Sequence, residues 1–594
     1  MRYSYGFFEE DQLANFGDAA LWRRISRYVW PQRRGVALAI LLSFAVIGTN
    51  LALPYLIRLA IDNFISAQQL PPAQRISGLG SLAALFIFLV ISGFAANFFQ
   101  VTVLERTGQN IMHRLRQQLF RHLTSLDLKF LNNTPAGKLV TRLTNDIQNM
   151  HEMFTSVAIT IFNDILQLIG ILVILYLMNW RLAALMSLLI PLVILHSVTF
   201  SRLARDAFRK IRTQLAIINS FLQETLGGMS LIQHFLREHD TEEKFKFQNQ
   251  LYQQQTLFQI KIFGFFLPLL ELISSLAIAM IIWFGGKEVL AGRTTIGEMA
   301  AFLSYMRLFF KPLREISQKY SIIQSAMASA ERIFQLLDRQ SALAKAGEKQ
   351  PKIRGDIKFK DVNFSYNDNE KIIRNLNLHI KPGESLAIVG PTGSGKTSII
   401  NLLARLYDPN SGQISIDEIK LPDFDLNWLR RQIGLVMQDI FLISGTFKEN
   451  LVFGEEISAE KITDILQKSQ LTEVVKNLPD GVNTIIGEGG YELSAGQKQL
   501  LALGRVMVRN PALLILDEAT ANIDSITEQL LERAISVSLS KRTSIIIAHR
   551  LSTIRHARQI LVLENGVITE QGSYDDLLAA NGLFSRLVHL QQIS

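Results

Sequence analysis

The first half of the chain contains six apolar segments of membrane-spanning length, and this pattern limits the fold more than any other feature. The segments lie near residues 36–64, 81–103, 156–178, 181–201, 262–285 and 298–320. A helix needs about 20 apolar residues to cross a bilayer, and in lipid it must satisfy its backbone hydrogen bonds internally. We therefore predict a bundle of six membrane helices. The last segment carries Arg307, Lys311 and Arg314, so its assignment as a span depends on the other five.

The distribution of basic residues predicts the orientation of these helices. Arginine and lysine are frequent in the connections near 104–155 and 202–261, whereas the connection at 66–80 contains only Arg75. Because basic residues accumulate on the cytoplasmic side of membrane proteins, we expect both chain ends and the two long connections to be cytoplasmic. We therefore expect a multi-pass protein of the cytoplasmic (inner) membrane, in contact with membrane lipids.

The two long connections keep a helical pattern and contain little glycine or proline, so they predict membrane helices that extend into the cytoplasm. Each has one break, around Asp127 to Gly137 in the first and around Gly227-Gly228 in the second. Before the first span, Leu21 to Trp30 is amphipathic and carries three arginines. This pattern is typical of a helix that lies on the cytoplasmic membrane surface, with an ordinary soluble helix as the alternative.

Composition agrees with a membrane portion joined to a water-soluble portion. A mean hydropathy of +0.20 is high for a soluble enzyme, yet 19% of the residues are charged. With no cysteine in its 594 residues, the chain has no disulfide, no zinc–thiolate site and no cysteine nucleophile. Much of the formal charge of +9 lies beside apolar segments, so we predict no nucleic-acid partner. The first twenty residues are polar without a leading basic cluster, and we expect no secretory signal.

The second half changes to short apolar strands that alternate with helices, which is an α/β pattern. The strands are expected at Ile357–Tyr366, Leu376–Ile380, Ser385–Val389, Ile433–Met437, Leu513–Leu516, Thr543–Ile547 and Gln559–Leu563. A polar stretch at 342–354 precedes the first strand and is typical of a linker.

One loop of this half carries a phosphate-binding pattern. The residues Gly390-Pro391-Thr392-Gly393-Ser394-Gly395-Lys396-Thr397 match G-x-x-x-x-G-K-[ST] at every fixed position, between a strand and a helix that runs from Ser398 to Leu406. Glycines let the backbone approach phosphate closely, so that N–H groups and the helix N-terminus point at the anion. In such loops the lysine, here Lys396, reaches the β and γ phosphates, and Thr397 would hold Mg²⁺. The loop predicts binding of a nucleoside triphosphate.

A second pattern supplies the acids that hydrolysis requires. The apolar strand from Leu513 ends in Asp517 and Glu518, about 120 residues after the phosphate loop. Asp517 is then placed to hold Mg²⁺ directly or through water, and Glu518 to polarise the attacking water as a general base. We therefore predict an enzyme that hydrolyses ATP.

The sequence Leu493-Ser494-Ala495-Gly496-Gln497 resembles the L-S-G-G-Q signature of ATP-binding cassette (ABC) proteins at all but one position. Over about residues 21–590 the chain resembles a half-transporter of the multidrug or lipid ABC exporters, similar to subunits of bacterial heterodimeric exporters. The resemblance implies a polytopic α-helical membrane domain of six transmembrane helices, followed by a C-terminal α/β P-loop ATPase domain. It divides the chain into a segment with an amphipathic elbow helix (1–35), a transmembrane domain (36–325), a linker (326–354) and a nucleotide-binding domain (355–594).

The resemblance also implies roles for single residues. Tyr366 is similar to the aromatic residue that stacks on adenine, and Ser398 belongs to the ATP-binding loop. Gln438 resembles the glutamine that contacts Mg²⁺ and the attacking water, and His549 resembles the histidine that bonds the γ-phosphate. Ser494, Gly496 and Gln497 would contact ATP held by another copy of the domain. Asp524 falls in the dimer-contact loop, and the chain breaks near Asp127–Asn133 and Gly227–Phe235 match the two coupling helices.

Ala495 is the one departure from the signature. The family's usual glycine lets the backbone come close to phosphate, and a Cβ crowds that approach. In family members built from two different subunits, an altered signature often accompanies a partner whose own phosphate site is weak. We therefore favour a heterodimer with a second half-transporter, in which this chain holds the competent site. A homodimer that tolerates alanine is the alternative.

Three acids lie inside the first five predicted spans: Asp62, Asp164 and Glu271. Ionisable residues in lipid face a cavity or a partner, because exposure to hydrocarbon is costly. Asp164 and Glu271 either meet amphipathic cations in a cavity or pair with basic groups such as Arg58 or Lys261. The resemblance as a whole implies ATP-driven export or flipping of small hydrophobic substrates, drugs or lipids, by alternating access. An ATP-gated channel or a regulatory subunit with the same cassette is the alternative.

Overall fold

The structure is a computed structural model. It describes residues 19–67, 69–341, 343, 346–367, 370–517, 525–540, 542–547, 554–555 and 557–593. The chain forms two compact units. The helical unit contains the described residues up to 124 and those from 136 to 339, and the sheet unit contains residues 125–135 and those from 340 onward.

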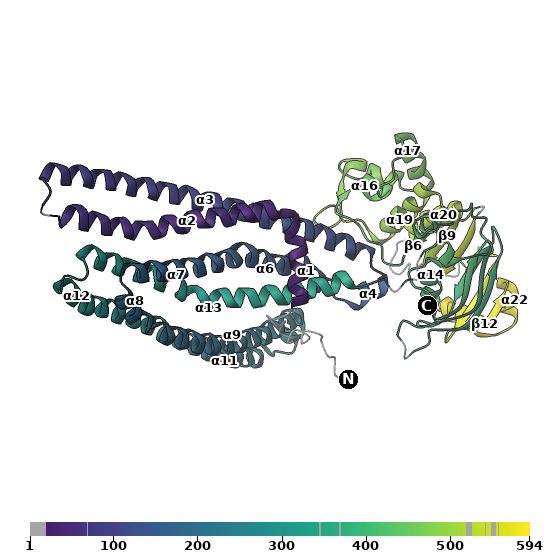
Figure 1. The fold of residues 1–594 in the computed structure, drawn as a ribbon. Helices are drawn as coiled ribbons and strands as arrows, with labels where there is room; N and C mark the ends of the chain where they lie inside the picture. The colour runs from purple at the N-terminus through teal and green to yellow at the C-terminus, as the bar shows by residue number, and fades with distance from the viewer. Residues whose placement is uncertain are drawn as a thin grey trace. The chain divides into compact units, whose positions relative to one another are not determined.

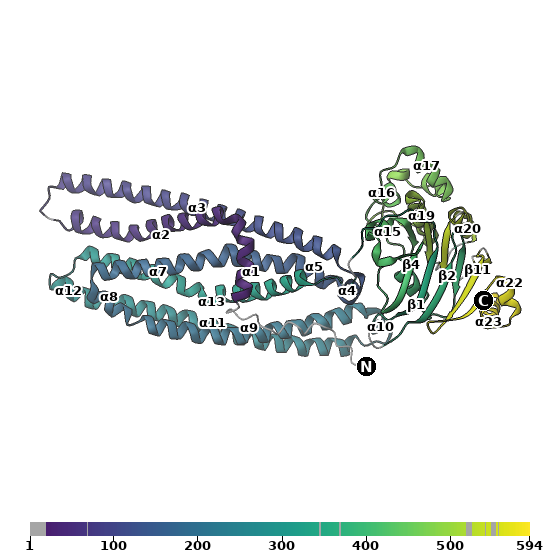
Figure 2. The ribbon, with the colours of Figure 1, turned by 45° about the vertical axis from the view of Figure 1, so that its right-hand side comes forward.

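Long helices build the helical unit. They are α1 (Ala19–Val29), α2 (Arg33–Ala60), α3 (Pro72–Ser125), α5 (Ala136–Thr141), α6 (Ile147–Glu152), α7 (Ile159–Met178), α8 (Trp180–Ser187), α9 (Ile190–Gly227), α10 (Met229–His234), α11 (Glu238–Met280), α12 (Gly286–Leu290) and α13 (Ile296–Asp338). Short 3-10 or π turns join several of them into longer runs. The amphipathic helix α1 lies across the bundle, and α9 and α11 run side by side (Figures 1 and 2).

Five helical runs among the described residues are long and apolar enough to cross a membrane. They are Ala19–Ile65, Pro72–Ser125, Ala136–Met178, Trp180–Gly227 and Glu238–Leu290. The sixth predicted segment is also a helix, α13, but it does not meet the same criterion of composition. Its apolar pattern is interrupted by Arg307 and Lys311, the residues that made its assignment depend on the others.

Two of the three acids within the first five predicted spans have partners. Asp164 of α7 forms an ion pair with Lys319 of α13, whose side chain is buried. Asp62 accepts hydrogen bonds from Thr295 Oγ1 at 2.6 Å and from the Gly297 N–H at 2.9 Å, and so caps the start of α13. The alternative in which Asp164 pairs with a basic group is therefore confirmed, although its partner is Lys319 rather than Arg58 or Lys261. Which residues meet depends on how the helices are rotated in the bundle, and the sequence pattern does not contain that rotation.

The sheet unit contains two larger sheets. The first has the order β2 (Ile373–Ile380), β1 (Ile357–Phe364), β4 (Ser411–Ile416) and β5 (Ile419–Lys420), and all its pairs are antiparallel. The second has the order β12 (Val567–Gly572), β11 (Gln559–Glu564), β3 (Ser385–Val389), β10 (Thr543–Ile547), β9 (Leu513–Asp517) and β6 (Ile433–Val436). Its strands are parallel except for β12 at one edge.

Helices surround these strands. They are α4 (Leu128–Asn133), α14 (Lys396–Leu403), α15 (Leu426–Gln432), α16 (Phe447–Val452), α17 (Ala459–Lys468), α18 (Thr472–Lys476), α19 (Ala495–Arg509), α20 (Ser525–Leu539), α22 (Tyr574–Ala579) and α23 (Leu583–Ile593). A small pair, β7 (Gly445–Thr446) and β8 (Ile485–Ile486), precedes α19. The central strands are buried on both faces: Leu386 and Ile388 of β3 belong to one core and Ala387 and Val389 to the other. This double burial explains why these strands read as continuous apolar runs.

Candidate active site

The carboxyl ends of the central parallel strands lie at the same level of the sheet. Ile547 at the end of β10 pairs with Ile388 of β3 on one side and with Asp517 of β9 on the other. On the far side of β9, Val436 at the end of β6 pairs with Leu516. The segments that follow these strands therefore begin at one edge of the sheet, which is where parallel α/β sheets bind ligands.

The phosphate loop leaves this edge between β3 and α14, and its backbone has the shape that glycine permits. Gly393 and Gly395 have left-handed φ angles of 82° and 104°. At Gly395 a Cβ would also lie 3.1 Å from the carbonyl oxygen of Ile372. An L side chain at such a position is strained, so the two glycines are required by geometry.

Lys396 is folded into the centre of the loop. Its Nζ donates to the carbonyl oxygens of Gly390 at 2.8 Å and Pro391 at 2.9 Å, and the residue is 7% exposed. Burial lowers the pKa of the Lys396 ammonium, and the attraction of Asp517 acts in the opposite direction. Beside it, Ser394 Oγ is buried without a hydrogen-bond partner among the described residues. A desolvated cation and an unsatisfied hydroxyl together fit a bound phosphate group.

Two oxygen donors for a metal ion lie at the end of the loop. Thr397, which is exposed at the start of α14, donates its hydroxyl to Asp517 Oδ2 at 3.5 Å. A hydroxyl and a carboxylate fit Mg²⁺, which is bound in nucleotide sites by few protein oxygens together with phosphate oxygens and water. Of the predicted catalytic residues, Glu518 directly follows Asp517 and His549 follows β10; both lie outside the described residues, as does Asp524.

Tyr366 stands close to the phosphate loop in the fold, after β1. Its Oη is 3.0 Å from Ser398 Oγ and accepts a hydrogen bond from Asn401 Nδ2 at 3.0 Å. Its ring meets that of Tyr407 edge to face, with 5.0 Å between the ring centroids. The structure therefore brings Tyr366, Ser398 and the loop together, as a binding site for a nucleotide base and its phosphates requires.

Gln438 lies in an exposed segment just after β6. The same segment exposes three large apolar side chains, those of Met437, Phe441 and Ile443. Exposed apolar groups that gather in this way mark a contact surface.

The segment Ser494–Gln497 forms the beginning of α19 through reciprocal capping. Gln497 N–H donates to Ser494 Oγ at 3.3 Å, and Ser494 N–H donates to Gln497 Oε1 at 3.0 Å. Ser494 and Ala495 are exposed and Gly496 is buried. Ala495 is the first residue of the helix and is not among the described residues with a left-handed backbone. The alanine therefore causes no backbone strain in its own chain.

Sequence reasoning missed two polar groups that hold this site. Asn132 of α4 donates to Tyr407 Oη at 3.1 Å, and a polar cavity of about 260 Å³ lies beside this contact. In α19, Arg505 donates to the Phe441 carbonyl at 2.8 Å and to both oxygens of the buried Asn450, at 2.7 Å and 2.9 Å. It thereby ties the exposed segment to the signature helix. An arginine within an otherwise apolar helix face was the available signal for the second group.

Comparison with known proteins agrees with this geometry in both units. Residues 36–313 match the ABC transporter transmembrane region, and residues 373–521 match the ABC transporter domain.

Similar proteins extend over most of the chain. The uncharacterized ABC transporter ATP-binding protein YknV of Bacillus subtilis is 34% identical over 98% of this chain and 97% of its own length. The ATP-dependent lipid A-core flippase of Desulfotalea psychrophila is 36% identical over 82% of this chain and 86% of the flippase. The multidrug resistance-like ATP-binding protein MdlB of Buchnera aphidicola is 33% identical over 96% of this chain and 97% of its own length. The structure of a bacterial Atm1-family ABC exporter with ATP bound matches at a TM-score of 0.79 and 28% identity, over 94% of this chain and 98% of that chain.

Proposed function

Because the chain belongs to the ABC transporters, in which a transmembrane region is joined to an ATPase domain, we propose that it exports hydrophobic or amphipathic molecules, drugs or lipids. The relatives and the solved neighbour make it a multi-pass membrane exporter driven by ATP hydrolysis. ABC exporters work as dimers, so a complete transporter contains a second half. The observation that carries the proposal is the presence on one chain of the folded phosphate loop and of five helical runs that can span a membrane.

We assign the ATP site residue by residue. Gly390 to Thr397 would hold the phosphates, with Lys396 as their cation, and Thr397 and Asp517 would bind Mg²⁺ together with Gln438. Bound ATP would supply the cleavable phosphoanhydride, and Mg²⁺ would neutralise charge on its phosphates. Glu518 would take a proton from the attacking water, and His549 would hold the γ-phosphate. Tyr366 would support the adenine, and Ser398 the phosphates at the start of α14.

The exposed ends of the long helices would transmit the closure of the ATP sites to the membrane-spanning helices. Leu231 of α10, and Phe235 and Leu236 directly after it, are largely exposed. A partner with an apolar groove is required to cover them. We propose that they dock on the partner's ATPase domain, on the surface equivalent to that formed here by Met437, Phe441 and Ile443. Alternating access would follow, because the closed pair of ATPase domains favours one conformation of the membrane helices and the open pair favours the other.

We propose further that the protein lies in the cytoplasmic membrane, with α1 on the cytoplasmic surface. Leu21 and Ile25 of α1 are buried against the bundle, while Arg23, Arg27 and the neighbouring Trp30 are exposed. An aromatic residue and cations on one short helix fit the headgroup region of a bilayer.

A heterodimer remains our preferred assembly. Ala495 presents its Cβ at the exposed start of α19, so that any crowding acts on ATP bound by the other subunit. This chain would then contribute an imperfect signature to a weak site and keep the competent site itself. Expression of this chain alone tests the proposal. Full substrate-stimulated ATPase activity from a homodimer would reject it.

The export function is tested with Glu518→Gln in the assembled transporter reconstituted in lipid vesicles. Loss of a general base reduces turnover about 10²–10⁴-fold, and export should fall with it. Glu473→Gln is a matched control, because Glu473 is an exposed glutamate of α18 whose one ion pair with a described residue is to Lys476, one turn away. Unchanged hydrolysis and export in Glu518→Gln would refute the proposed mechanism.

A further inference from the structure

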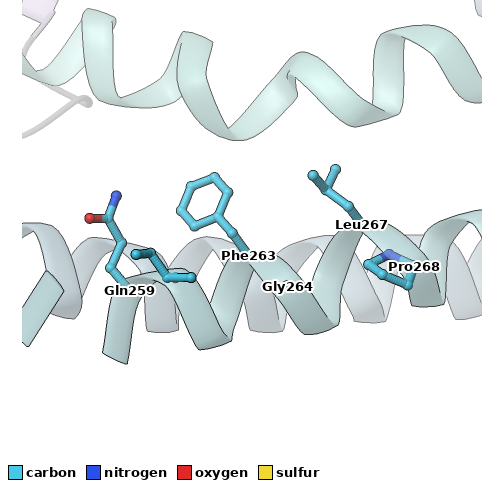
Figure 3. Close-up of a pocket in the computed structure, with 6 residues that line it drawn as sticks. Gln259, Phe263, Gly264, Leu267 and Pro268 are labelled. Atoms are coloured by element: carbon cyan, nitrogen blue, oxygen red, sulfur yellow. The ribbon is translucent and has the colours of Figure 1, made fainter. Parts of the chain in front are cut away.

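An open apolar cavity lies along α11. It has a volume of about 420 Å³ and is lined by Gln259, Ile260, Phe263, Gly264, Leu267 and Pro268. Phe263 and Leu267 point away from their own helix toward the facing one (Figure 3). Sites for small organic molecules have volumes of about 300–1,000 Å³ and mostly apolar walls with a few polar groups. The cavity therefore has the size and lining of a site for one such molecule.

Glu271 continues the face of α11 that lines this cavity. Ile260, Gly264, Leu267 and Glu271 follow the spacing i, i+4, i+7 and i+11, which places them in one stripe along a helix. With a rise of 1.5 Å per residue, Glu271 lies about 6 Å along the axis from Leu267. It is the only charged residue between Lys261 and Lys287. Glu271 thus lies about one helical turn beyond Leu267, on the face of α11 that lines the cavity.

Unlike the other two acids of the first five predicted spans, Glu271 has no hydrogen bond or ion pair with any described residue, and it is exposed. Asp164 is paired with Lys319, and Asp62 caps α13. Lys261 lies ten residues away on the same helix, about 15 Å along the axis, which is too far for an ion pair. A bare carboxylate at this depth costs several kcal/mol, so a cation from outside the described chain is needed to balance it.

A second acceptor lies in the same stripe. Pro268 has no N–H, so it makes no helical hydrogen bond to the carbonyl of Gly264 four residues earlier. Gly264 has no side chain to cover that carbonyl, and apart from its chain neighbours and the backbone of its own helix no heavy atom of the described residues lies within 4 Å of the position its Cβ would occupy. The polar groups along this face are therefore the Gln259 amide, the Gly264 carbonyl and, beyond the lining residues, the Glu271 carboxylate. No described residue that lines the cavity is positively charged.

We propose that this face of α11 binds an amphipathic organic cation, with its positive group at Glu271 and its apolar body against Phe263 and Leu267. The role of this site in transport rests on the proposed export function. The binding itself does not, because it can be measured without ATP turnover. It narrows the exported molecules to those that combine a delocalised or shielded positive charge with an apolar surface.

The test uses the assembled transporter in lipid nanodiscs and two probes of similar shape, the cation tetraphenylphosphonium and the neutral triphenylphosphine oxide. Glu271→Gln should weaken binding of the cation at least about 10-fold, or about 1.4 kcal/mol, and change binding of the neutral probe less than about 2-fold. Glu271→Asp, which keeps the charge, should retain most of the affinity for the cation. Leu267→Ala should weaken the binding of both probes, because it removes apolar contact.

Glu243→Gln is the control on the same helix. Glu243 is an exposed residue near the start of α11 and pairs with Lys246, so this variant should leave cation binding and basal ATPase activity as they are. Unchanged cation binding in Glu271→Gln would overturn the inference. Equal loss of both probes together with loss of the dimer would also overturn it, because Glu271 would then be a subunit contact. Charge-dependent binding in a protein without ATPase activity would instead refute the export function and leave this site standing.

Discussion

The contact between α4 and the packed side chains of Tyr366 and Tyr407 yields the sharpest prediction of the structure. Asn132 donates to Tyr407 Oη at 3.1 Å, and the Tyr407 ring packs edge to face on Tyr366. Tyr407 is 8% exposed. Burial raises the pKa of the Tyr407 phenol, with the hydrogen bond from Asn132 acting in the opposite direction, so the phenol stays neutral at working pH. The hydrogen bond is thus neutral and largely desolvated. It joins α4, which follows the long helix α3, to the neighbourhood of the ATP site.

The size of this contact can be isolated with a double-mutant cycle of Asn132→Ala and Tyr407→Phe. A neutral hydrogen bond contributes about 0.5–1.5 kcal/mol net, and an interaction energy near 1 kcal/mol corresponds to a factor of about 5 in an equilibrium constant. The measured quantity is the opening equilibrium of the segment 126–135, from amide hydrogen exchange of the intact transporter. Each single variant should speed exchange there about 5-fold, and the double variant should be little worse than either.

Tyr366→Phe is the matched control for this cycle. It deletes a hydroxyl that bonds Ser398 and Asn401 and makes no hydrogen bond to Asn132 in the described structure. It should weaken ATP binding and leave exchange in the segment 126–135 unchanged. An interaction energy below about 0.3 kcal/mol, which means additive single effects, would refute the claim that this hydrogen bond holds α4 to the rest of the sheet unit.

Three further predictions concern the ATP site and α1. Gly395→Ala forces a side chain into a left-handed backbone and should raise the Kd for ATP at least about 10-fold in nucleotide titrations, whereas Gly454→Ala, with φ of 84° and open space, should affect stability only. Asp517→Asn should raise the Mg²⁺ concentration for half-maximal ATPase activity at least about 10-fold, because it removes an anionic ligand. The hydrogen bond from Arg24 lowers the pKa of the Asp338 carboxyl below its ordinary 3.8, so this pair stabilises the docked α1 above that pH and loses its effect as the pH falls through the lowered value. Fluorescence of a label on α1 should therefore report its release only in strong acid, and Asp338→Asn should remove that dependence.

Local features of the fold were predictable from the sequence because their causes are local. The strands β3 and β10 have the predicted bounds, Ser385–Val389 and Thr543–Ile547, since each is a short apolar run buried on both faces. β12 was missed, because Val567–Gly572 alternates in burial at a sheet edge and contains three polar side chains and a glycine. The phosphate loop was predictable for a similar reason: its shape follows from glycines within eight consecutive residues.

Contacts between distant parts of the sequence were not predictable. Asp164 and Lys319 are 155 residues apart, and Asn132 and Tyr407 are 275 residues apart. Each pair depends on which helix face meets which neighbour, and a hydrophobic pattern determines that a face is buried without determining its partner. For the acids within the first five predicted spans, the sequence therefore did not decide between pairing with a basic group and exposure to a cavity. The structure distinguishes these acids: Asp62 and Asp164 have partners, and Glu271 is exposed.

Ala495 shows where a departure from a family pattern has its effect. If the usual glycine were needed for the shape of its own helix start, alanine would appear as a left-handed residue or a broken cap. The structure has neither, because α19 begins at Ala495 and the reciprocal bonds of Ser494 and Gln497 are intact. The change therefore leaves folding of this chain unaffected. Its consequence must fall on whatever approaches the exposed Cβ, which we propose is the nucleotide held by the other subunit of the dimer. The identity of that subunit, rather than any property of this chain alone, decides whether the alanine weakens hydrolysis or is tolerated.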